Sequence, residues 1–187
     1  WIRLNSDLKN FLTSIYFIDN ENGWTVGYNF SASKNRNSIF PFVLKTTNSG
    51  TNWIKINLDN QIGSYKDIYF TNLNTGWICG DSGTIFKTTN SGYNWIRQNT
   101  SCIQGGLNPI MLYDIKFVNI NTGYCSGSES VLLKTTNSGN NWLLINNNGY
   151  QGRSFYGLNF INESTGWVTS SEGLILKTTN GGNVFIS

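Results

Sequence analysis

Short runs of alternating apolar and polar residues fill the chain, and glycine, asparagine, aspartate and serine separate them. One clear set of four runs is Tyr65–Phe70, Gly76–Gly80, Thr84–Thr89 and Asn94–Gln98. Each run has the length of a strand and is rich in β-branched or aromatic residues. No stretch sustains the 3.6-residue period of a helix. The pattern therefore predicts an all-β protein.

The first run of each set places two large apolar residues two positions apart, so both lie on one face of the strand. These pairs are Ile15 and Phe17, Ile68 and Phe70, Ile115 and Phe117, and Leu158 and Phe160. A large aromatic residue follows a glycine at the start of the second run; these residues are Trp24, Trp77, Tyr124 and Trp167. We expect these rings to lie between neighbouring sheets, where each buried ring contributes roughly 2–3 kcal/mol.

One nine-residue string occurs four times, with copies that begin about 43 residues apart; the copies are Lys45–Trp53, Lys87–Trp95, Lys134–Trp142 and a degenerate Lys177–Phe185. A fixed string at one period indicates stacked copies of one supersecondary unit. Four antiparallel strands of this total length form one propeller blade. We predict a single β-propeller domain over residues 1–187, with repeat units 1–52, 53–94, 95–141 and 142–184.

The two ends of the repeat bear on ring closure. Trp1–Asn5 aligns with the fourth strand of a blade, and Val184–Ile186 begins another. About four blades are expected, which is the lower limit for a ring, and an open arc would expose blade faces. We expect a larger ring, completed by more of the same polypeptide or by a second copy. The alternative is a four-bladed ring in which Trp1–Asn5 pairs with Leu174–Thr179.

Within each string, the order Thr46-x-Asn48-x-Gly50-x-Asn52-Trp53 resembles the Asp-box, the bacterial neuraminidase repeat, whose pattern is Ser/Thr-x-Asp-x-Gly-x-Thr-Trp. Together with the preceding Gly-Trp run, the unit is similar to the propeller repeats of photosystem II stability/assembly factors. Such propellers are also common in secreted bacterial proteins. The resemblance covers nearly the whole chain and implies a β-propeller fold.

This chain has asparagine where the Asp-box has aspartate. The turn residues concerned are Asn48, Gly50, Trp53, Asn90, Gly92, Trp95, Asn137, Gly139, Trp142, Asn180 and Gly182. An asparagine oxygen can still accept backbone N–H groups across the turn between the third and fourth strands, and glycine supplies a left-handed backbone. We interpret the string as a structural turn, because a calcium or substrate site would need the missing carboxylate.

Composition excludes several functions. Charged residues make up only 12% of the chain, and the net charge of +3 comes from scattered basic residues, so nucleic-acid binding is not expected. No apolar run is long enough to cross a membrane. There is no histidine, and Cys79, Cys102 and Cys125 lack the paired spacing of a zinc site, so we expect no metal and no cofactor. The cysteines are either buried thiols or form one disulfide that uses Cys102.

Asp-box propellers include sialidases and other glycoside hydrolases, so an enzyme must be considered. A sialidase would need an arginine cluster, whereas the chain has only Arg3, Arg36, Arg97 and Arg153. A hydrolase needs two nearby carboxylates. Asp67 and Asp114, at the same position of two first strands, are the best candidates, and a structural bond repeated by duplication is the simpler interpretation. Asp81, Glu129 and Glu172 lie in turns. We expect no enzyme activity.

Three segments vary between the repeats, and in an alternating meander all three emerge opposite the Asp-box turns: Tyr28–Phe42, Asn99–Met111 and Asn146–Ser154. Loops of variable length on a rigid scaffold commonly carry recognition. The candidate binding residues are Tyr28, Phe30, Lys34, Arg36, Phe40, Phe42, Tyr150 and Arg153. Aromatic residues with arginine suit contact with a protein or a glycan; stabilisation of the loops is the alternative role.

We therefore expect a non-enzymatic, extracytoplasmic β-propeller that binds or scaffolds another protein. The alternative is a carbohydrate-active or glycan-binding propeller fragment, sialidase-like or of another glycoside hydrolase type. A photosystem assembly role would be a narrower form of the first idea and has only the resemblance behind it. An extracellular, cell-surface or periplasmic location is expected from the likeness to secreted propellers. The chain begins at Trp1 and its only methionine is Met111, so a translated start is missing: the sequence is a processed form or part of a longer chain, and a removed secretion signal is one explanation.

Overall fold

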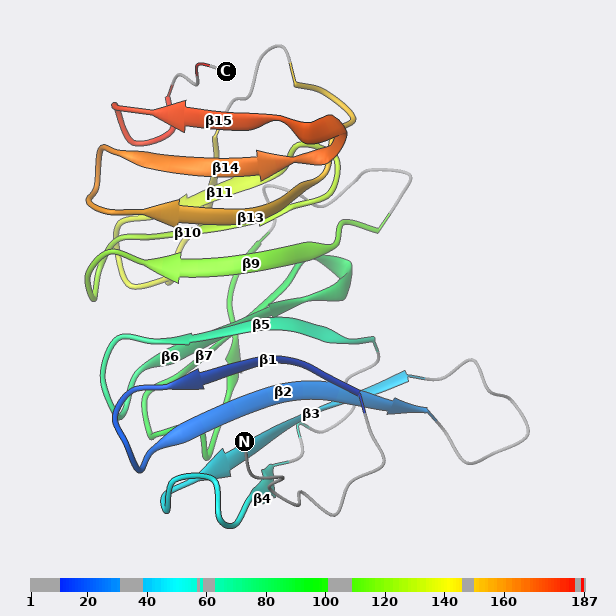
Figure 1. The fold of residues 1–187 in the computed structure, drawn as a ribbon, viewed down its shortest axis with the longest axis vertical. Coiled ribbons are helices and arrows are strands. Elements are labelled where there is room, and N and C mark those ends of the chain that lie inside the picture. Colours follow the sequence, from blue (N-terminus) through cyan, green and yellow to red (C-terminus); the bar gives the residue numbers. More distant parts are fainter. Residues whose placement is uncertain are drawn as a thin grey trace.

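Four antiparallel sheets follow one another along the chain (Figure 1). The structure is a computed structural model that describes residues 11–30, 39–56, 58, 63–100, 109–145, 150–183 and 186. The only helical segments in these ranges are two three-residue 3₁₀ turns, η1 (Asp81–Gly83) and η3 (Ser171–Gly173). The predicted all-β propeller of four-stranded antiparallel blades is confirmed.

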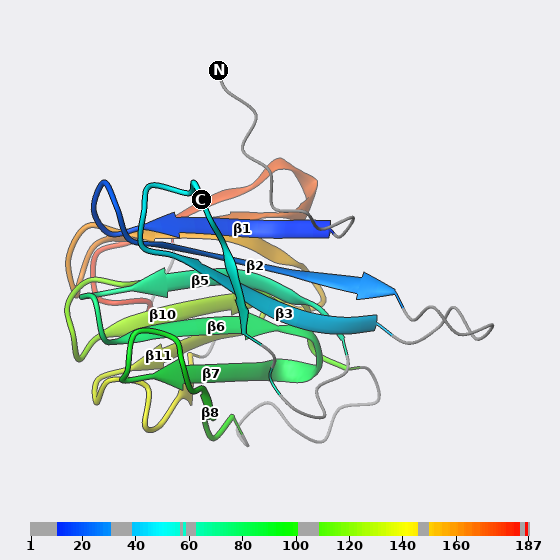
Figure 2. The same ribbon diagram turned by 90° about the horizontal axis from the view of Figure 1, so that it is seen from below.

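The strands of each sheet lie side by side in chain order, as β5 to β8 show in Figure 2. Blade I contains β1 (Phe11–Phe17), β2 (Gly23–Phe30), β3 (Ile39–Thr46) and β4 (Ile54–Ile56). Blade II contains β5 (Tyr65–Phe70), β6 (Gly76–Gly80), β7 (Thr84–Thr88) and β8 (Ile96–Arg97). Blade III contains β9 (Leu112–Phe117), β10 (Gly123–Gly127), β11 (Leu132–Thr135) and β12 (Leu143–Leu144). Blade IV contains β13 (Phe155–Phe160), β14 (Gly166–Ser170) and β15 (Ile175–Thr178), with Ile186 bridged to Lys177 at the fourth-strand position.

The core lies between the blades. In each of the three joints, the first strand of the following blade packs on the first two strands of the blade before it: β5 on β1 and β2, β9 on β5 and β6, and β13 on β9 and β10. Flat ring pairs fill the joints, with centroid distances of 3.6 Å for Trp24–Phe70, 3.7 Å for Trp77–Phe117 and 3.6 Å for Tyr124–Phe160. The expected wedging of aromatic rings between blades is thus confirmed for these three pairs.

The wedging rings also donate hydrogen bonds to the next blade. Trp24 Nε1 donates to the Ser91 carbonyl at 3.0 Å, and Trp77 Nε1 donates to the Ser138 carbonyl at 3.2 Å. Both acceptors lie in the turn between the third and fourth strands of the following blade. Because each ring is fully buried and its polar atom is satisfied, the joint gains packing without leaving a buried donor unpaired.

The two described cysteines also meet at a joint. Cys79 and Cys125 face opposite sides of their own blades. Because blades II and III are neighbours, both thiols enter the same buried cluster, where they are free. Burial, reinforced by Cys125, raises the pKa of the Cys79 thiol well above its usual range. Cys102 lies outside the described residues.

The repeat turn, which joins the third and fourth strands of a blade, is built around a buried threonine. In blade II the Thr88 Oγ1 atom accepts hydrogen bonds from the N–H groups of Asn90 at 3.3 Å and Gly92 at 2.9 Å, and it donates to Asn90 Oδ1 at 3.0 Å. Asn90 Oδ1 also accepts the Asn94 N–H at 2.9 Å. The expected left-handed glycine backbone is confirmed: φ is 80°, 83°, 80° and 92° at Gly50, Gly92, Gly139 and Gly182.

The row of blades is open. Blade I and blade IV lie at opposite ends of it in Figure 1, and apolar side chains on their outer faces are exposed to solvent. Lys177 exchanges two backbone hydrogen bonds with Ile186, of 2.8 and 2.9 Å, so the place beside Lys177 is taken. Trp1–Asn5, which the four-bladed alternative requires at this edge, lie outside the described residues. The larger ring stays a prediction.

Candidate functional site: bulges and aromatic side chains at the loop edge

Each first strand carries a β-bulge at the same place. In blade I, Leu12 pairs with Gly27 and Ser14 with Val26, so Thr13 between them has no partner across the sheet. The corresponding unpaired residues of the four blades are Thr13, Lys66, Tyr113 and Tyr156. A bulge turns the extra side chain away from the regular alternation. The fold therefore presents one variable side chain from each innermost strand, a set that we call the bulge row.

A glycine opposite the bulge makes this geometry fit. A Cβ atom added at Gly27 would lie 2.0 Å from the Phe11 carbonyl oxygen, and one added at Gly80 would lie 2.4 Å from the Ser64 carbonyl oxygen. Both distances are shorter than any real Cβ contact. The second strand can therefore approach the start of the first strand only where it has no side chain.

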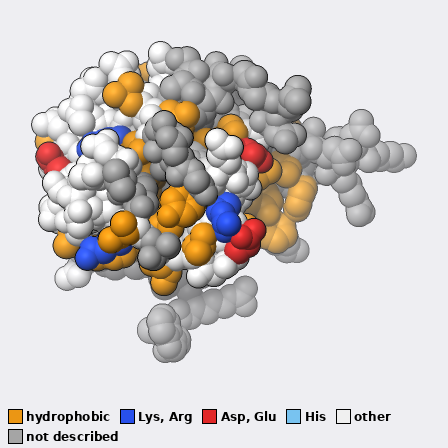
Figure 3. Space-filling model, turned by 90° about the horizontal axis from the view of Figure 1, so that it is seen from above, with side chains coloured by type: hydrophobic (Ala, Val, Ile, Leu, Met, Phe, Trp, Pro, Cys, Tyr) orange, Lys and Arg blue, Asp and Glu red, His pale blue; other side chains and the backbone are white. Residues whose placement is uncertain are grey.

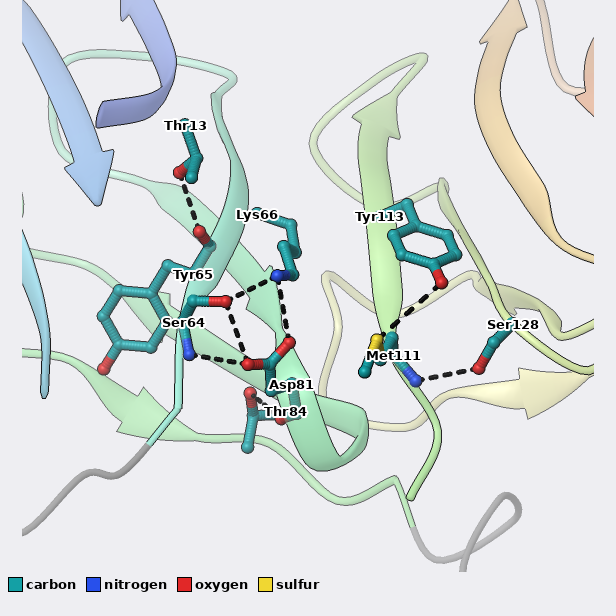
Figure 4. A network of polar contacts seen from close by, with 9 residues as sticks. All are labelled: Thr13, Ser64, Tyr65, Lys66, Asp81, Thr84, Met111, Tyr113 and Ser128. Carbon is teal, nitrogen blue, oxygen red and sulfur yellow. Dashed lines mark hydrogen bonds and ion pairs between the residues drawn. The ribbon is translucent and has the colours of Figure 1, made fainter. Parts of the chain in front are cut away.

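Polar side chains tie the bulge row to its surroundings (Figure 4). Thr13 Oγ1 donates to the Tyr65 carbonyl in the next blade at 2.7 Å. Asp81, in the turn η1, accepts hydrogen bonds from the N–H and hydroxyl of Ser64 at 2.8 and 2.9 Å, and its other oxygen pairs with Lys66 at 3.2 Å. Asp81 thus has the structural turn role expected for a polar residue at this position.

The two candidate acids, Asp67 and Asp114, form bonds between blades. Asp67 Oδ2 accepts the Ile115 N–H at 3.1 Å, and Asp114 Oδ2 accepts the Leu158 N–H at 2.8 Å. Lys116 lies between them, with its Nζ atom 2.8 Å from Asp67 Oδ2 and 2.7 Å from Asp114 Oδ1. The same bond recurs at two joints, as expected for a structural contact repeated by duplication.

The electrostatics of this group are unequal. Burial, together with the neighbouring Asp67, raises the pKa of the Asp114 carboxyl to about 6, although Lys116 acts in the opposite direction. Burial also opposes ionisation of Asp67, but a hydrogen bond shared with Asp114 and the charge of Lys116 outweigh it and lower the pKa of Asp67. A lysine between two carboxylates that already bind backbone N–H groups supports a structural role.

The described candidate binding residues of blade I lie on two long paired strands, β2 and β3, rather than on a loop. Tyr28 pairs with Pro41 and Phe30 with Ile39, so strand structure continues where the sequence led us to expect a loop over 28–42. Phe30 and Phe40 are 49% and 42% exposed, whereas Phe42 is fully buried and does not reach the surface. Lys34 and Arg36 lie outside the described residues.

Phe11 joins this hairpin and was not among the residues expected from the sequence. Its ring stacks on Tyr28 at 5.2 Å and meets Phe30 edge-on at 5.6 Å, while Tyr28 and Phe30 are 5.7 Å apart. We call Phe11, Tyr28 and Phe30 the aromatic cluster. The place of Phe11 opposite Tyr28 follows from the pairing of β1 with β2, and no local pattern in the sequence marks that pairing.

The remaining candidates, Tyr150 and Arg153, lie in the segment before β13. Arg153 Nη1 pairs with Glu172 at 2.5 Å. The Tyr150 carbonyl accepts a hydrogen bond from the Ser130 hydroxyl. At the bulge row, the Tyr113 and Tyr156 rings are 5.2 Å apart, and Tyr156 is 55% exposed. The described ends of the three variable segments all lie opposite the repeat turns in Figure 1.

A groove of about 690 Å³ lies along the third and fourth strands of blade III and the turn between them, with Asn99 and Asn183 also in its lining. Its lining includes Asn137, Asn141, Trp142 and Lys134. Trp142 is only 3% exposed, so its ring cannot act as a stacking surface for a sugar. Within the described residues, no group of three or more potential metal ligands occurs, and no helix is long and apolar enough to cross a membrane.

Comparisons with known proteins agree with this architecture. The family model described as photosynthesis system II assembly factor YCF48 matches residues 99–186, slightly under half of the chain. The chain has a β-propeller fold, and its second half is similar to the BNR repeats of this family. This propeller resembles the photosystem II assembly factor, and no curated protein matches its sequence.

Solved structures of similar fold fall into different functional groups. YCF48 from Cyanidioschyzon merolae is 14% identical with a TM-score of 0.67, over 92% of this chain and 52% of that one. The GH74 enzyme of Niastella koreensis is 13% identical with a TM-score of 0.73, over 94% of this chain and 29% of that one. The computationally designed Ika4 protein is 10% identical with a TM-score of 0.67, over 96% of both chains. The propeller thus spans about half of the YCF48 structure and under a third of the GH74 enzyme, and these likenesses describe the fold alone.

Proposed function

We propose that this propeller is a non-enzymatic module that binds other proteins outside the cytoplasm, with the aromatic cluster at the centre of its contact surface. The cluster carries the proposal because it is both exposed and held in place. Phe11 and Phe30 are 54% and 49% exposed, yet their rings pack on each other and on Tyr28. Aromatic side chains dominate the binding energy of protein interfaces.

The rigidity of the cluster favours binding. All three rings stand on paired strands, Phe11 on β1 and the other two on β2. A side chain that is already held by its neighbours loses less conformational freedom when a partner binds. Sites on strands also keep their geometry more precisely than sites on loops. The matched family is described as an assembly factor, a role exerted on other proteins, and this description supports the same class of function.

Two observations favour a binding role over hydrolysis. The candidate carboxylates Asp67 and Asp114 hold backbone N–H groups of the next blade and share Lys116. In addition, no histidine occurs in the chain, so a Ser/His/Asp or Cys/His nucleophile cannot be assembled within it. The extracytoplasmic location rests on the likeness of the repeat to the propellers of secreted bacterial proteins.

The test is a parallel screen of the purified chain against a displayed library of random peptides and against a glycan array. We expect the chain to select peptides that contain apolar or aromatic residues and to bind no glycan. For the best peptide, Phe30→Ser should weaken binding by about tenfold or more, which corresponds to about 1.4 kcal/mol.

Leu73→Ser is the matched control, because Leu73 is 46% exposed and lies in the β5–β6 turn at the opposite edge. This variant should bind the peptide as the unchanged chain does. Hydrolysis products on the glycan array, or equal effects of the two substitutions on peptide binding, would contradict the proposed function.

A further inference from the structure

Two positions of the second strands meet in the same way at the first two joints between blades. In the joint of blades I and II these positions hold Val26 on β2 and Ile78 on β6, which are fully buried in one apolar cluster. In the joint of blades II and III they hold Cys79 on β6 and Cys125 on β10, which are also fully buried in one cluster. Two thiols therefore occupy a contact that the neighbouring joint makes with two aliphatic side chains.

The strand register brings the two cysteines level with each other across this joint. Cys79 lies opposite Asp67 within blade II, and Cys125 lies opposite Ile115 within blade III. Residues that are paired across antiparallel strands point to the same face of the sheet. Asp67 Oδ2 accepts the Ile115 N–H at 3.1 Å, and Ile115 belongs to the same buried cluster as both cysteines. The two cross-strand pairs therefore face each other, with one thiol in each.

The closed joint keeps both thiols away from solvent. The stacked rings of Trp77 and Phe117 belong to the same cluster, and the surface at the blade IV end is formed by other side chains and backbone (Figure 3). Burial, followed by a hydrogen bond with Cys125, raises the pKa of the Cys79 thiol well above its usual range. The thiolate is the form that reacts with a disulfide. Reaction therefore requires that the joint opens or that the blades have not yet packed.

We propose that Cys79 and Cys125 form a redox site, and that a small-molecule disulfide oxidises them to a disulfide bond between blades II and III. The thiolate of one cysteine attacks the small disulfide, which gives a mixed disulfide and releases one small thiolate. The thiolate of the other cysteine then attacks the sulfur of the first cysteine, so that the bond between the blades forms and a second small thiolate leaves. The two protons lost by the cysteines pass to the two released thiolates, and the small disulfide is reduced.

The bond would fix the spacing of two blades that contribute to the loop edge. Lys66 and Tyr113 of the bulge row lie on the first strands of blades II and III, so their separation depends on this joint. In the reduced chain the joint is held by packing and by the bonds of Asp67 to Ile115 and Lys116. A cross-link restricts the unfolded chain and so stabilises the folded one, and disulfides persist in oxidising compartments. The inference goes beyond the proposed binding function and does not rest on it.

Peptide mapping of the full chain by mass spectrometry tests the proposal. The reduced chain is refolded from urea with oxidised glutathione, which gives the oxidant access before the blades pack, and the remaining thiols are then alkylated in denaturant. We expect one linked pair of peptides, one containing Cys79 and the other Cys125. A Cys102→Ser chain should give the same link. Incubation of the already folded chain with oxidised glutathione should give this link more slowly, because both thiols are buried.

Thermal unfolding gives an independent measure. The linked chain should melt roughly 5–15 °C above the reduced chain, and reduction should remove the difference. Cys79→Val, which places the valine of blade I at the equivalent position, is the control and should melt at the same temperature with and without oxidant. The proposal would be overturned if the refolded chain kept both Cys79 and Cys125 open to alkylation, if either of them linked only to Cys102, or if the linked chain melted no higher than the reduced one.

Discussion

The buried threonine of the repeat turn is expected to matter more than the asparagine that the family pattern emphasises. Thr88 is 1% exposed, and its Oγ1 atom takes part in three hydrogen bonds, with Asn90 N–H, Gly92 N–H and Asn90 Oδ1. Thr88→Val keeps the shape of the side chain and removes that oxygen. The substitution therefore isolates the hydrogen bonds from the packing.

The cost follows from which partners water can reach. Gly92 is buried, so its N–H would lose its acceptor without replacement, at about 1–3 kcal/mol. The lost bond to Asn90 Oδ1 adds about 0.5–1.5 kcal/mol, while the N–H of the exposed Asn90 can bind water. The total is about 2–4 kcal/mol, which for a chain of this length lowers the melting temperature by roughly 5–15 °C.

Thermal and urea unfolding of four variants would check this order. Asn90→Ala removes only the acceptor of the Thr88 hydroxyl and of the exposed Asn94 N–H, so we expect a smaller loss of about 1–2 kcal/mol. Asn90→Asp keeps the acceptor and should be nearly neutral. Thr89→Val makes the same chemical change as Thr88→Val at an exposed neighbour and is the control. If Thr89→Val cost as much as Thr88→Val, or if Asn90→Ala cost more, the reasoning would be refuted.

Three further outcomes are expected. Because the fold raises the pKa of Asp114 to about 6, the folded chain holds a proton on Asp114 between about pH 4 and 6, where the unfolded chain has released it, and the stability that this proton contributes is lost as the pH rises through the window. The melting temperature of the unchanged chain relative to Asp114→Asn should therefore fall as pH rises from 5 to 7.5, and a constant difference would contradict the shift. Trp77→Ala should lower the free energy of unfolding in urea by about 3–5 kcal/mol, because the ring is fully buried against Phe117. Trp167→Ala should lower it much less, because no described ring stacks on Trp167; equal losses would contradict this difference. Replacing residues 29–40 with a short Asp-Ser-Gly turn should preserve the melting temperature, since the buried Phe42 is kept, and abolish binding of a peptide selected by the unchanged chain; retained binding in a folded variant would remove this hairpin from the contact surface.

The candidate site was only partly predictable. The long hairpin of blade I could be located because its length departs from the repeat, and Phe30 and Phe40 on it are exposed as expected. Phe42 was included because it ends the variable segment, and it is buried because the strands continue through it. Phe11 was missed because its role depends on pairing with Tyr28 across two strands, which no local pattern records.

The sequence by itself determined the strands, the turns and the order of the blades. Alternation with a period of two and the conformational demands of tight turns are local properties, so each repeat specifies its own sheet without reference to the others. Thr, Asn and Gly at fixed spacing are sufficient to specify the repeat turn. For the same reason the wedging rings could be identified from their place after a glycine.

Only the tertiary structure decided which side chains meet between blades. The ion pair of Lys116 with Asp67 joins residues of neighbouring blades, and Cys79 meets Cys125 in the same way. The exposure of Ile15 and Ile175 likewise reflects the absence of a neighbouring blade, since equivalent residues elsewhere in the described chain are buried. These contacts depend on how whole sheets stack, and stacking is set by non-local packing that no short stretch of sequence contains.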